Sequence, residues 1–406
     1  MSATNATATT EHDQVDLVRE RVAELVNNFP PNKVTAEQFW GAQYDLGLAW
    51  VHFPMGLGGL GVSPSLGEYV VTTLRSAGAP FSFMRNPIGI GMGAPTLVTH
   101  GSRELASRLL RPMFTCEHIW CQLFSEPNAG SDVASLATRA ERDGDEWIIN
   151  GQKVWTTLAH VSKWGMLIAR SDPSVPKHAG MTYFVFDMGS PGVEVRPLRQ
   201  MTGEAEFNEV YLNNLRIPDS QRLGDIGKGW SVAITTLMNE RVSIGGNLAQ
   251  RGSGTIAEAV KLWNSSKHQT AAHRDELLRL WVDAEVNRLT NIRAAQLRSA
   301  GNPGPEGSVA KLAYAELNKD IYSFCMNLLG AAGLEYPSYE MRRPEIAGVT
   351  ERGDRNIAKM FLRSRANSIE GGTSEIMRNI LGERVLGLPG EPRSDKDLPW
   401  SQIPKN

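Results

Sequence analysis

The chain has 406 residues, of which 41% are hydrophobic and 21% charged, so it can form roughly two or three domains with buried cores. Its formal net charge of -2 and the absence of a basic run give no reason to expect nucleic acid or an anionic membrane surface as a partner. No segment approaches the apolar length of a membrane span. Three cysteines without metal-ligand spacing argue against a disulfide framework or a metal site and favour a cytoplasmic location.

The first part of the chain has apolar residues at helical spacing. The first such residues, at steps of three and four, are Val15, Val18, Val22 and Leu25. Further helices are expected over residues 36–47, 66–78 and 103–110. Residues 1–10, rich in Ser, Thr and Ala, should be a frayed tail. The pattern predicts an N-terminal helical domain over residues 1–117.

Between residues 118 and 225 the apolar period changes to two, which is typical of half-buried strands. Strands bounded by Gly, Pro or Asp are predicted over residues 166–170, 183–187, 193–198 and 209–213. The same alternation precedes Ser125 and runs from Trp147 to Trp155, with a polar turn at residues 143–145 between them. These strands predict a small middle β-domain.

Helical spacing returns at Gly229, where one stripe is apolar except for Glu240. Beyond Gly254, a further helix is predicted by four apolar residues: Leu278, Val282, Val286 and Leu289. After a turn at residues 301–305, another long helix carries Ala313 to Leu328. Short turns between long amphipathic helices favour antiparallel neighbours. Residues 226–390 should therefore form a C-terminal helical bundle, followed by a tail over residues 391–406.

One loop in the β-domain has the residue types of a binding site. Residues 126–130, Glu-Pro-Asn-Ala-Gly, form a turn, so four residues should lie at strand ends beside it: Ser125, Ser131, Trp155 and Thr157. Small hydroxyls, free N–H groups and a flat indole can bind the edge of a planar heterocycle and cover its face. A plain β-hairpin with a Trp in its core is the alternative interpretation of the spacing.

A second candidate lies near the C-terminus. Gly371 and Gly372 lead into a helical segment, so Thr373 should be the N-cap, with free N–H groups and the positive helix end facing an anion such as a diphosphate. The helix should end before Gly387, because Pro389 follows. An ordinary helix cap without a ligand is the alternative.

Taken together, these motifs resemble the acyl-CoA dehydrogenase family. The resemblance is carried by Ser-Glu-Pro-x-Ala-Gly-Ser-Asp at 125–132, Asn-Gly-x-Lys-x-Trp-x-Thr at 150–157, Met-Thr-Gly at 201–203 with Phe-Asn-Glu-Val at 207–210, and Gly-Gly-Thr-Ser-Glu-Ile at 371–376. It extends from about Val15 to about Pro389. It implies an α+β multidomain fold with an N-terminal helical domain, a β-barrel-like middle domain and a C-terminal four-helix bundle. It also implies FAD as cofactor, and an acyl-CoA thioester that loses a proton from Cα and a hydride from Cβ to flavin N5.

The resemblance assigns roles to individual residues. The flavin ring would be contacted by Phe124, Ser125, Trp155 and Thr157. Other parts of FAD would be contacted by Ser131, Gly372, Thr373 and Glu375. The substrate would be contacted by Ser131 and Arg241 at its CoA portion and by the Gly371 N–H at its thioester oxygen.

The catalytic base departs from the commonest family pattern. Many members place a glutamate immediately before the Gly-Thr of the last motif, but that position is Gly371 here, and Glu370 is one residue too early. A minority carry the base before an arginine on the first helix of the C-terminal domain, which corresponds to Glu240 and Arg241. A surface ion pair with Arg241 is the alternative role for Glu240, and its place on the apolar stripe argues against that role. Burial beside Trp230, Leu237 and Ile244 should raise the pKa of Glu240, an effect that Arg241 opposes.

The resemblance also implies partners. It predicts an electron-transfer flavoprotein as electron acceptor, and a homo- or hetero-oligomer of related chains in which residues 327–333 reach the FAD of a neighbour. The family's Arg-x-x-Phe-Gly motif, whose arginine contacts that FAD, is missing from residues 257–268. Two alternatives therefore stay open: a non-catalytic or co-catalytic subunit of a hetero-oligomer, and an acyl-CoA oxidase or flavin monooxygenase of the same fold.

Overall fold

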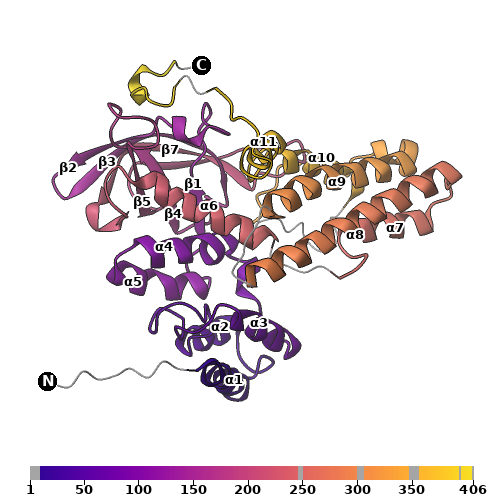
Figure 1. Cartoon of the computed structure of the whole chain (residues 1–406), viewed down its shortest axis with the longest axis horizontal. Coiled ribbons are helices and arrows are strands. Elements are labelled where there is room, and N and C mark those ends of the chain that lie inside the picture. Colours follow the sequence, from indigo (N-terminus) through magenta and orange to yellow (C-terminus); the bar gives the residue numbers. More distant parts are fainter. Residues whose placement is uncertain (1–9, 246–249, 300–305, 347–355, 393–394, 405–406) are drawn as a thin grey trace.

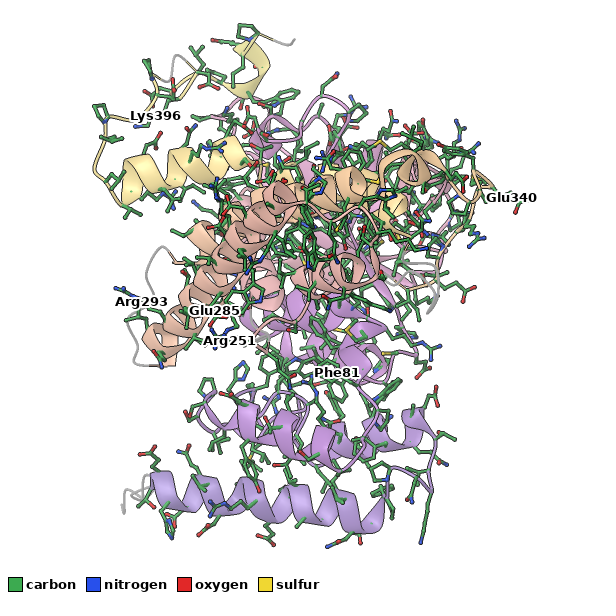
Figure 2. All side chains as sticks on the ribbon, turned by 90° about the vertical axis from the view of Figure 1, so that its right-hand side faces the viewer. Phe81, Arg251, Glu285, Arg293, Glu340 and Lys396 are labelled. Atoms are coloured by element: carbon green, nitrogen blue, oxygen red, sulfur yellow. The ribbon has the colours of Figure 1, made fainter. Side chains whose placement is uncertain are left out.

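The computed structural model describes residues 10–245, 250–299, 306–346, 356–392 and 395–404. The side chains of residues 240–245, 298–299 and 306 lie outside this description. N-terminal helices, a β-sheet and C-terminal helices occupy three regions of the molecule (Figure 1). In the perpendicular view of Figure 2, Lys396 of the C-terminal tail lies at the upper left, and Phe81 of the N-terminal region lies in the lower half.

The N-terminal region is helical, as predicted. Its α-helices are α1 (Glu11–Asn28), α2 (Ala36–Asp45), α3 (Leu66–Ser76), α4 (Ala94–His100) and α5 (Arg103–Phe114). Thr10 and Thr35 begin α1 and α2 with capping boxes, in which each threonine side chain accepts from a backbone N–H three residues later. Val18, Val22 and Leu25 are buried, so the apolar face predicted for α1 packs against the core. The short helix α4, preceded by a π-helical turn at Gly89–Gly93, was not predicted.

The middle region contains one mixed sheet. Its strands are β1 (Trp120–Leu123), β2 (Arg139–Asp143), β3 (Glu146–Thr157), β4 (Trp164–Arg170), β5 (Met181–Asp187), β6 (Val193–Pro197), β7 (Phe207–Pro218) and β8 (Arg222–Leu223). They lie in the order β6-β7-β3-β2-β4-β5-β8, and β1 pairs with β4 in parallel. The predicted strands and the predicted turn between Asp143 and Glu146 are present, while β2 and β8 were not predicted.

The C-terminal region is again helical. Its α-helices are α6 (Gly229–Gly245), α7 (Thr255–Ser265), α8 (Ala271–Ser299), α9 (Glu306–Leu329), α10 (Ile357–Ser364) and α11 (Ser374–Arg384). Helix α6 lies between the sheet and α4 (Figure 1). There the hydroxyl of Thr236 lies 3.0 Å from that of Thr96 and 3.1 Å from that of Tyr183. These hydrogen bonds connect the N-terminal, middle and C-terminal regions. Helices α7, α8, α10 and α11 all pack against α9.

Two C-terminal segments return to the β-sheet region. Residues 336–342, between α9 and α10, run beside residues 202–205, with the Ala205 N–H donating to the carbonyl of Arg342 at 2.7 Å. The tail crosses the loop between β4 and β5, where the N–H of Trp400 donates to the carbonyl of Val175 at 2.9 Å. Within the described residues, no helix combines the length and apolar character that crossing a membrane requires.

Candidate active site

The loop after β1 is fixed by a buried ion pair. The Lys153 ammonium, with no exposed surface, lies 2.8 Å from Glu126 Oε1. It also donates to the carbonyls of Phe124 at 3.1 Å and Ile168 at 2.9 Å. Burial opposes the charge of Glu126, but Lys153 and the hydrogen bonds to the carboxylate outweigh that effect and lower the pKa of Glu126. Burial also lowers the pKa of Lys153, although Glu126 counteracts it.

The same pair joins the two predicted motifs of the middle domain. Lys153 belongs to β3, two residues before Trp155, and Glu126 follows Ser125 directly. The carbonyl of Ser125 accepts the N–H of Val154 at 2.9 Å. Glu126 and Lys153 were missed as site residues, although each lies inside a motif that the sequence had singled out.

Trp155 and Thr157 lie at the end of β3, as predicted. The indole of Trp155 is 57% exposed, and its backbone has φ of +60°, at a bulge between Lys153 and Thr156 in the pairing with β7. The indole therefore stands out from the sheet, and the tryptophan buried in this hairpin is Trp147. This observation excludes the simple hairpin with Trp155 in its core.

Ser131 was expected at a strand end, and that prediction was wrong. It lies in the loop between β1 and the short helix Val133–Ser135, because Glu126 and Ala129 pair with each other in a tight turn and lengthen the connection. Within the described part of the chain, the side chains of Ser125, Ser131 and Thr157 form no hydrogen bond to protein. These hydroxyls are available to a ligand. Phe124 is instead buried with its ring against Tyr183, so it can offer a ligand only its backbone.

The beginning of α11 has the predicted cap. Thr373 Oγ1 accepts the N–H of Ile376 at 3.1 Å. Gly371 and Gly372 precede it with φ of +64° and +94°, a region that glycine adopts without strain. A Cβ on Gly372 would lie 2.6 Å from Met377 Cε. Glu375, in the first turn, is exposed and lies 3.5 Å from Arg378.

A continuous series of contacts connects Trp155 to this glycine turn. The rings of Trp155 and Phe207 meet edge to face, with centroids 5.8 Å apart. The guanidinium of Arg363 lies 5.9 Å from the Phe207 ring centroid, and it pairs with Glu370, the residue before Gly371. Two motifs more than 200 residues apart in the sequence, at Trp155 and Gly371, are thus linked through Phe207 and Arg363.

Glu370 is fully engaged in this arrangement. Arg363 donates to both carboxylate oxygens, at 3.1 and 2.9 Å, and Asn367 donates to one of them at 2.8 Å. Arg363 was also missed, and the sequence around it carries no motif that could have indicated it.

The predicted base, Glu240, lies on α6 with Arg241, but both side chains are outside the described residues. The same holds for Ile244. Trp230 and Leu237, expected beside Glu240, are half-buried and pack against the core that joins the N-terminal and middle regions. Helix α6 therefore begins at the junction of the three regions.

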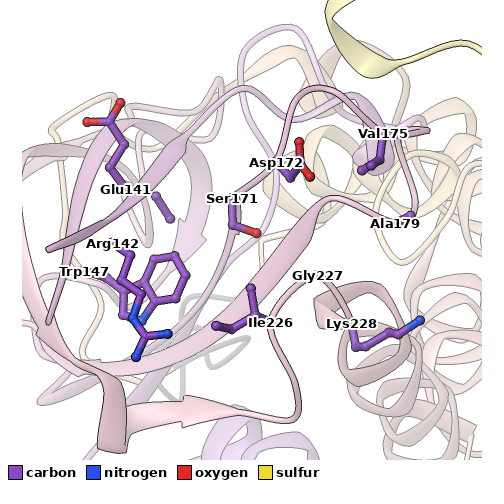
Figure 3. A pocket seen from close by; sticks show the side chains of 11 residues that line it. Glu141, Arg142, Trp147, Ser171, Asp172, Val175, Ala179, Ile226, Gly227 and Lys228 are labelled. Atoms are coloured by element: carbon purple, nitrogen blue, oxygen red, sulfur yellow. The ribbon is translucent and has the colours of Figure 1, made fainter. Parts of the chain in front are cut away.

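A cavity of about 650 Å³ lies elsewhere, between the β2–β3 hairpin and the loops around Asp172 and Gly227 (Figure 3). Figure 3 shows Arg142, Trp147 and Lys228 among its lining side chains. No residue of the predicted site lines it. Among the residues with described positions, no group of three or more His, Cys, Asp or Glu could hold a metal ion.

The groups at the candidate site suit a cofactor with a planar ring and a diphosphate. The exposed indole of Trp155 can cover a ring, the unpaired hydroxyls can bind its polar edge, and the N-terminus of α11 attracts an anion. The indole and the hydroxyls belong to the middle region, and the helix N-terminus belongs to the C-terminal region. A ligand with a planar ring at one end and a diphosphate further along could use both sets of groups.

Comparisons with known proteins agree with the predicted family. The domains described as acyl-CoA dehydrogenase N-terminal, middle and C-terminal match residues 11–117, 121–215 and 227–386. Acyl-CoA dehydrogenase FadE34 of Mycobacterium tuberculosis is 38% identical over 347 residues, which cover 85% of this chain and 45% of FadE34. This chain thus spans less than half the length of that relative.

Two further comparisons cover most of both chains. Acyl-CoA dehydrogenase IpdE1 of Mycobacterium tuberculosis is 35% identical over 353 residues, 86% of each chain. The crystal structure of the ChsE4-ChsE5 complex from Mycobacterium tuberculosis matches with a TM-score of 0.68 and 26% identity, over 96% of this chain and 100% of that one. The predicted family and fold class are confirmed.

Proposed function

The chain belongs to the acyl-CoA dehydrogenase family, and on that premise we propose that it dehydrogenates an acyl-CoA thioester between Cα and Cβ with FAD bound beside Trp155. The observation that carries the proposal is the series of contacts from Trp155 through Phe207 and Arg363 to Glu370. This series links the proposed ring-binding residues to the proposed anion-binding turn, which supports a single site for the cofactor.

The residues of both motifs would hold the cofactor. Trp155 would cover one face of the flavin, while Ser125 and Thr157 would bind its polar edge with Phe124 contributing backbone groups. Gly372 and Thr373 would bind the diphosphate through N–H groups, and Ser131 and Glu375 would contact other parts of FAD. When bound, FAD accepts the hydride that leaves Cβ.

The substrate would be activated by groups of the protein. The N–H of Gly371 would donate to the thioester oxygen, and a preorganised donor of this kind typically contributes about 3 kcal/mol to the stability of the transition state. Ser131 and Arg241 would contact the CoA portion. Glu240 would remove the α-proton, and the double hydrogen bond from Arg363 to Glu370 supports this choice of base, because it occupies both oxygens of the rival carboxylate.

The base assignment has a direct test. Glu240→Gln should still bind substrate and perturb the flavin spectrum, but flavin reduction in rapid mixing should slow by at least ~10²–10⁴-fold, the contribution of an essential base. Glu370→Gln should retain most of the activity. The reverse result, with reduction abolished only by Glu370→Gln, would show that the base is Glu370.

We propose that the chain functions as an oligomer. Leu278, Val282, Val286 and Leu289 line one face of α8, and each is more than half exposed. The helical spacing predicted this stripe, but nothing in the described chain covers it. A homo-oligomer and a heteromer with a related chain would both cover it, and a relative of similar fold is described as the ChsE4-ChsE5 complex.

A non-catalytic or co-catalytic subunit is the second candidate function, favoured by the missing Arg-x-x-Phe-Gly motif in the stretch that forms much of α7. The visible spectrum of the chain expressed alone decides between the two. A yellow protein that is reduced by an acyl-CoA supports the dehydrogenase, whereas a folded, colourless protein indicates that FAD needs a second chain.

The remaining features follow from the proposed activity. We propose an electron-transfer flavoprotein as acceptor and a cytoplasmic location, with domain boundaries near residues 117, 225 and 390. Rapid reoxidation of the reduced, product-bound flavin in air would instead indicate an oxidase or a monooxygenase. A panel of CoA thioesters assayed with an artificial electron acceptor would identify the acyl group.

A further inference from the structure

Arg363 lies where α10, the middle region and the glycine turn meet. Its Nε is 3.7 Å from Glu206 Oε1, on the segment that leads into β7. Its two terminal nitrogens donate to Glu370, and its guanidinium lies over Phe207, the ring that contacts Trp155. One side chain therefore touches both halves of the proposed FAD and substrate site.

A second ion pair fixes the helix that carries Arg363. Lys359, one turn earlier on α10, lies 2.7 Å from Glu204, and these side chains are only 6% and 10% exposed. Four residues of α-helix rise about 6 Å, and two residues of extended chain span about 6.6 Å. The two cations on α10 therefore match the spacing of Glu204 and Glu206 on the middle region.

The conformation of the glycine turn at Gly371 and Gly372 is fixed by contacts of the neighbouring residues. Gly371 and Gly372 have no side chains, and glycine has wide conformational freedom. The turn is held on one side by Glu370 and on the other by the Thr373 cap. Lys311 also donates to the carbonyl of Gly372. Because Gly371 follows Glu370 directly, the groups that hold Glu370 restrict the orientation of the peptide that carries the Gly371 N–H.

We propose that Arg363 is a positioning residue, which through Glu370 aims the Gly371 N–H at the thioester oxygen and through Phe207 fixes Trp155 beside the flavin. This inference rests on the proposed function. It gives Glu370 a structural role as the counter-charge of Arg363. A glutamine at position 370 can still accept from Arg363, whereas an alanine cannot.

The charges predict unequal effects of the substitutions. Arg363→Met leaves Glu206 and Glu370 close together without their shared cation, while Glu370→Gln leaves the pair of Arg363 with Glu206 intact. Arg363→Lys keeps one positive charge but loses the planar fork that reaches two carboxylates. The effect should therefore increase from Glu370→Gln through Arg363→Lys to Arg363→Met.

The experiment uses the FAD-loaded protein and the acyl-CoA that reduces it. Flavin reduction should slow by less than about tenfold in Glu370→Gln, and by about tenfold to a hundredfold in Glu370→Ala and Arg363→Met, the cost of a misplaced oxyanion donor. The stretching frequency of an isotope-labelled thioester carbonyl in bound enoyl-CoA should rise in the two slow variants, because its hydrogen bond is weakened. Loss of general stability would not produce that shift.

The matched control is Arg216→Met. Arg216 also lies between two carboxylates, at 3.0 Å from Asp143 and 2.9 Å from Glu146, but on the exposed surface of the middle region. The Arg216→Met substitution should leave both the rate of flavin reduction and the carbonyl stretching frequency unchanged. If Arg363→Met does not fold, Glu370→Ala and Arg363→Lys provide the same comparison.

The outcomes separate the two proposals. Wild-type flavin that no acyl-CoA reduces would refute the proposed function together with this inference. A wild type that is reduced, with an unchanged carbonyl frequency in Glu370→Ala and Arg363→Lys, would refute the positioning role alone. Equal and complete loss of reduction in Glu370→Gln and Glu370→Ala would make Glu370 the base.

Discussion

Lys153 Nζ lies 2.8 Å from Glu126 Oε1 in the interior of the middle domain, and both side chains are almost completely buried. The pair connects β3, which presents Trp155, to the turn that follows Ser125. Because Glu126 also accepts the N–H groups of Ala137 at 2.7 Å and Thr138 at 2.9 Å, it holds the far end of the same loop. The loop that carries Ser131 is therefore fixed at both ends by one carboxylate.

Lys153→Met should strongly destabilise the protein. It leaves the Glu126 carboxylate buried without its cation, and loss of one partner of a buried pair costs about 3–5 kcal/mol. Urea unfolding measures the change in the free energy of unfolding. The control is Lys163→Met, which removes an exposed pair with Asp187 and should cost no more than about 1 kcal/mol. Similar losses in both variants would contradict the prediction.

Asp219 should make stability depend on pH in the acid range. Arg222 donates to both of its oxygens, at 2.9 and 3.1 Å, and Trp147 donates to one at 2.8 Å. The hydrogen bond from Arg222 lowers the pKa of Asp219 from 3.8 to about 2, although burial opposes the shift. A carboxylate with a lowered folded-state pKa stabilises the protein above its unfolded-state pKa, and that stabilisation is lost as the pH falls through the folded-state pKa.

The stability of the wild type should therefore exceed that of Asp219→Asn by a constant amount above about pH 4, and the difference should shrink as the pH falls toward about 2. Urea unfolding of both proteins across this range measures the difference. The other titrating groups contribute equally to the free energy of unfolding of the wild type and of Asp219→Asn, so their contributions cancel in the difference at each pH. A difference that stays constant through the acid range would show that Asp219 has no lowered pKa.

The exposed stripe on α8 should be a subunit interface. Val286→Asp puts a charge at the middle of the stripe, and burial of an unpaired carboxylate against a partner is costly. Light scattering should therefore show a smaller assembly than that of the wild type. Val71→Asp, at an exposed position of α3, is the control and should not change the mass. A wild type that is monomeric with stoichiometric FAD would contradict the proposal.

Trp400→Ala should release the C-terminal tail. The Trp400 ring lies 5.0 Å from the guanidinium of Arg170, and its indole N–H donates to the carbonyl of Ser135 at 3.3 Å. Limited proteolysis followed by mass spectrometry should then show faster cleavage within residues 391–404. Leu398→Ala, at a more exposed position of the tail, should not accelerate cleavage. Equal cleavage of wild type and Trp400→Ala would show that the tail is held by other contacts.

The amino-acid sequence alone predicted the order of the three regions and most of their elements. The spacing of Val18, Val22 and Leu25 identified the buried face of α1, because a helix brings such residues together whatever surrounds it. The caps at Thr373 and the turn beside Ser125 were also predictable, since they depend on neighbouring residues. The motifs around Trp155 and Gly371 indicated the family, but not the contacts through Phe207 and Arg363 that link them.

Tertiary structure decided which of these features lie together and which are covered. The stripe from Leu278 to Leu289 has the same spacing as a core face, yet it is exposed, because periodicity shows which face is apolar and not what packs against it. Arg363 lies in no recognisable motif, and its second partner, Glu206, belongs to a distant part of the chain, so only folding brings these two charges together. Trp155 and the Gly371 turn are linked through Phe207, Arg363 and Glu370. The motifs could therefore be recognised in the sequence, but the contacts between them exist only in three dimensions.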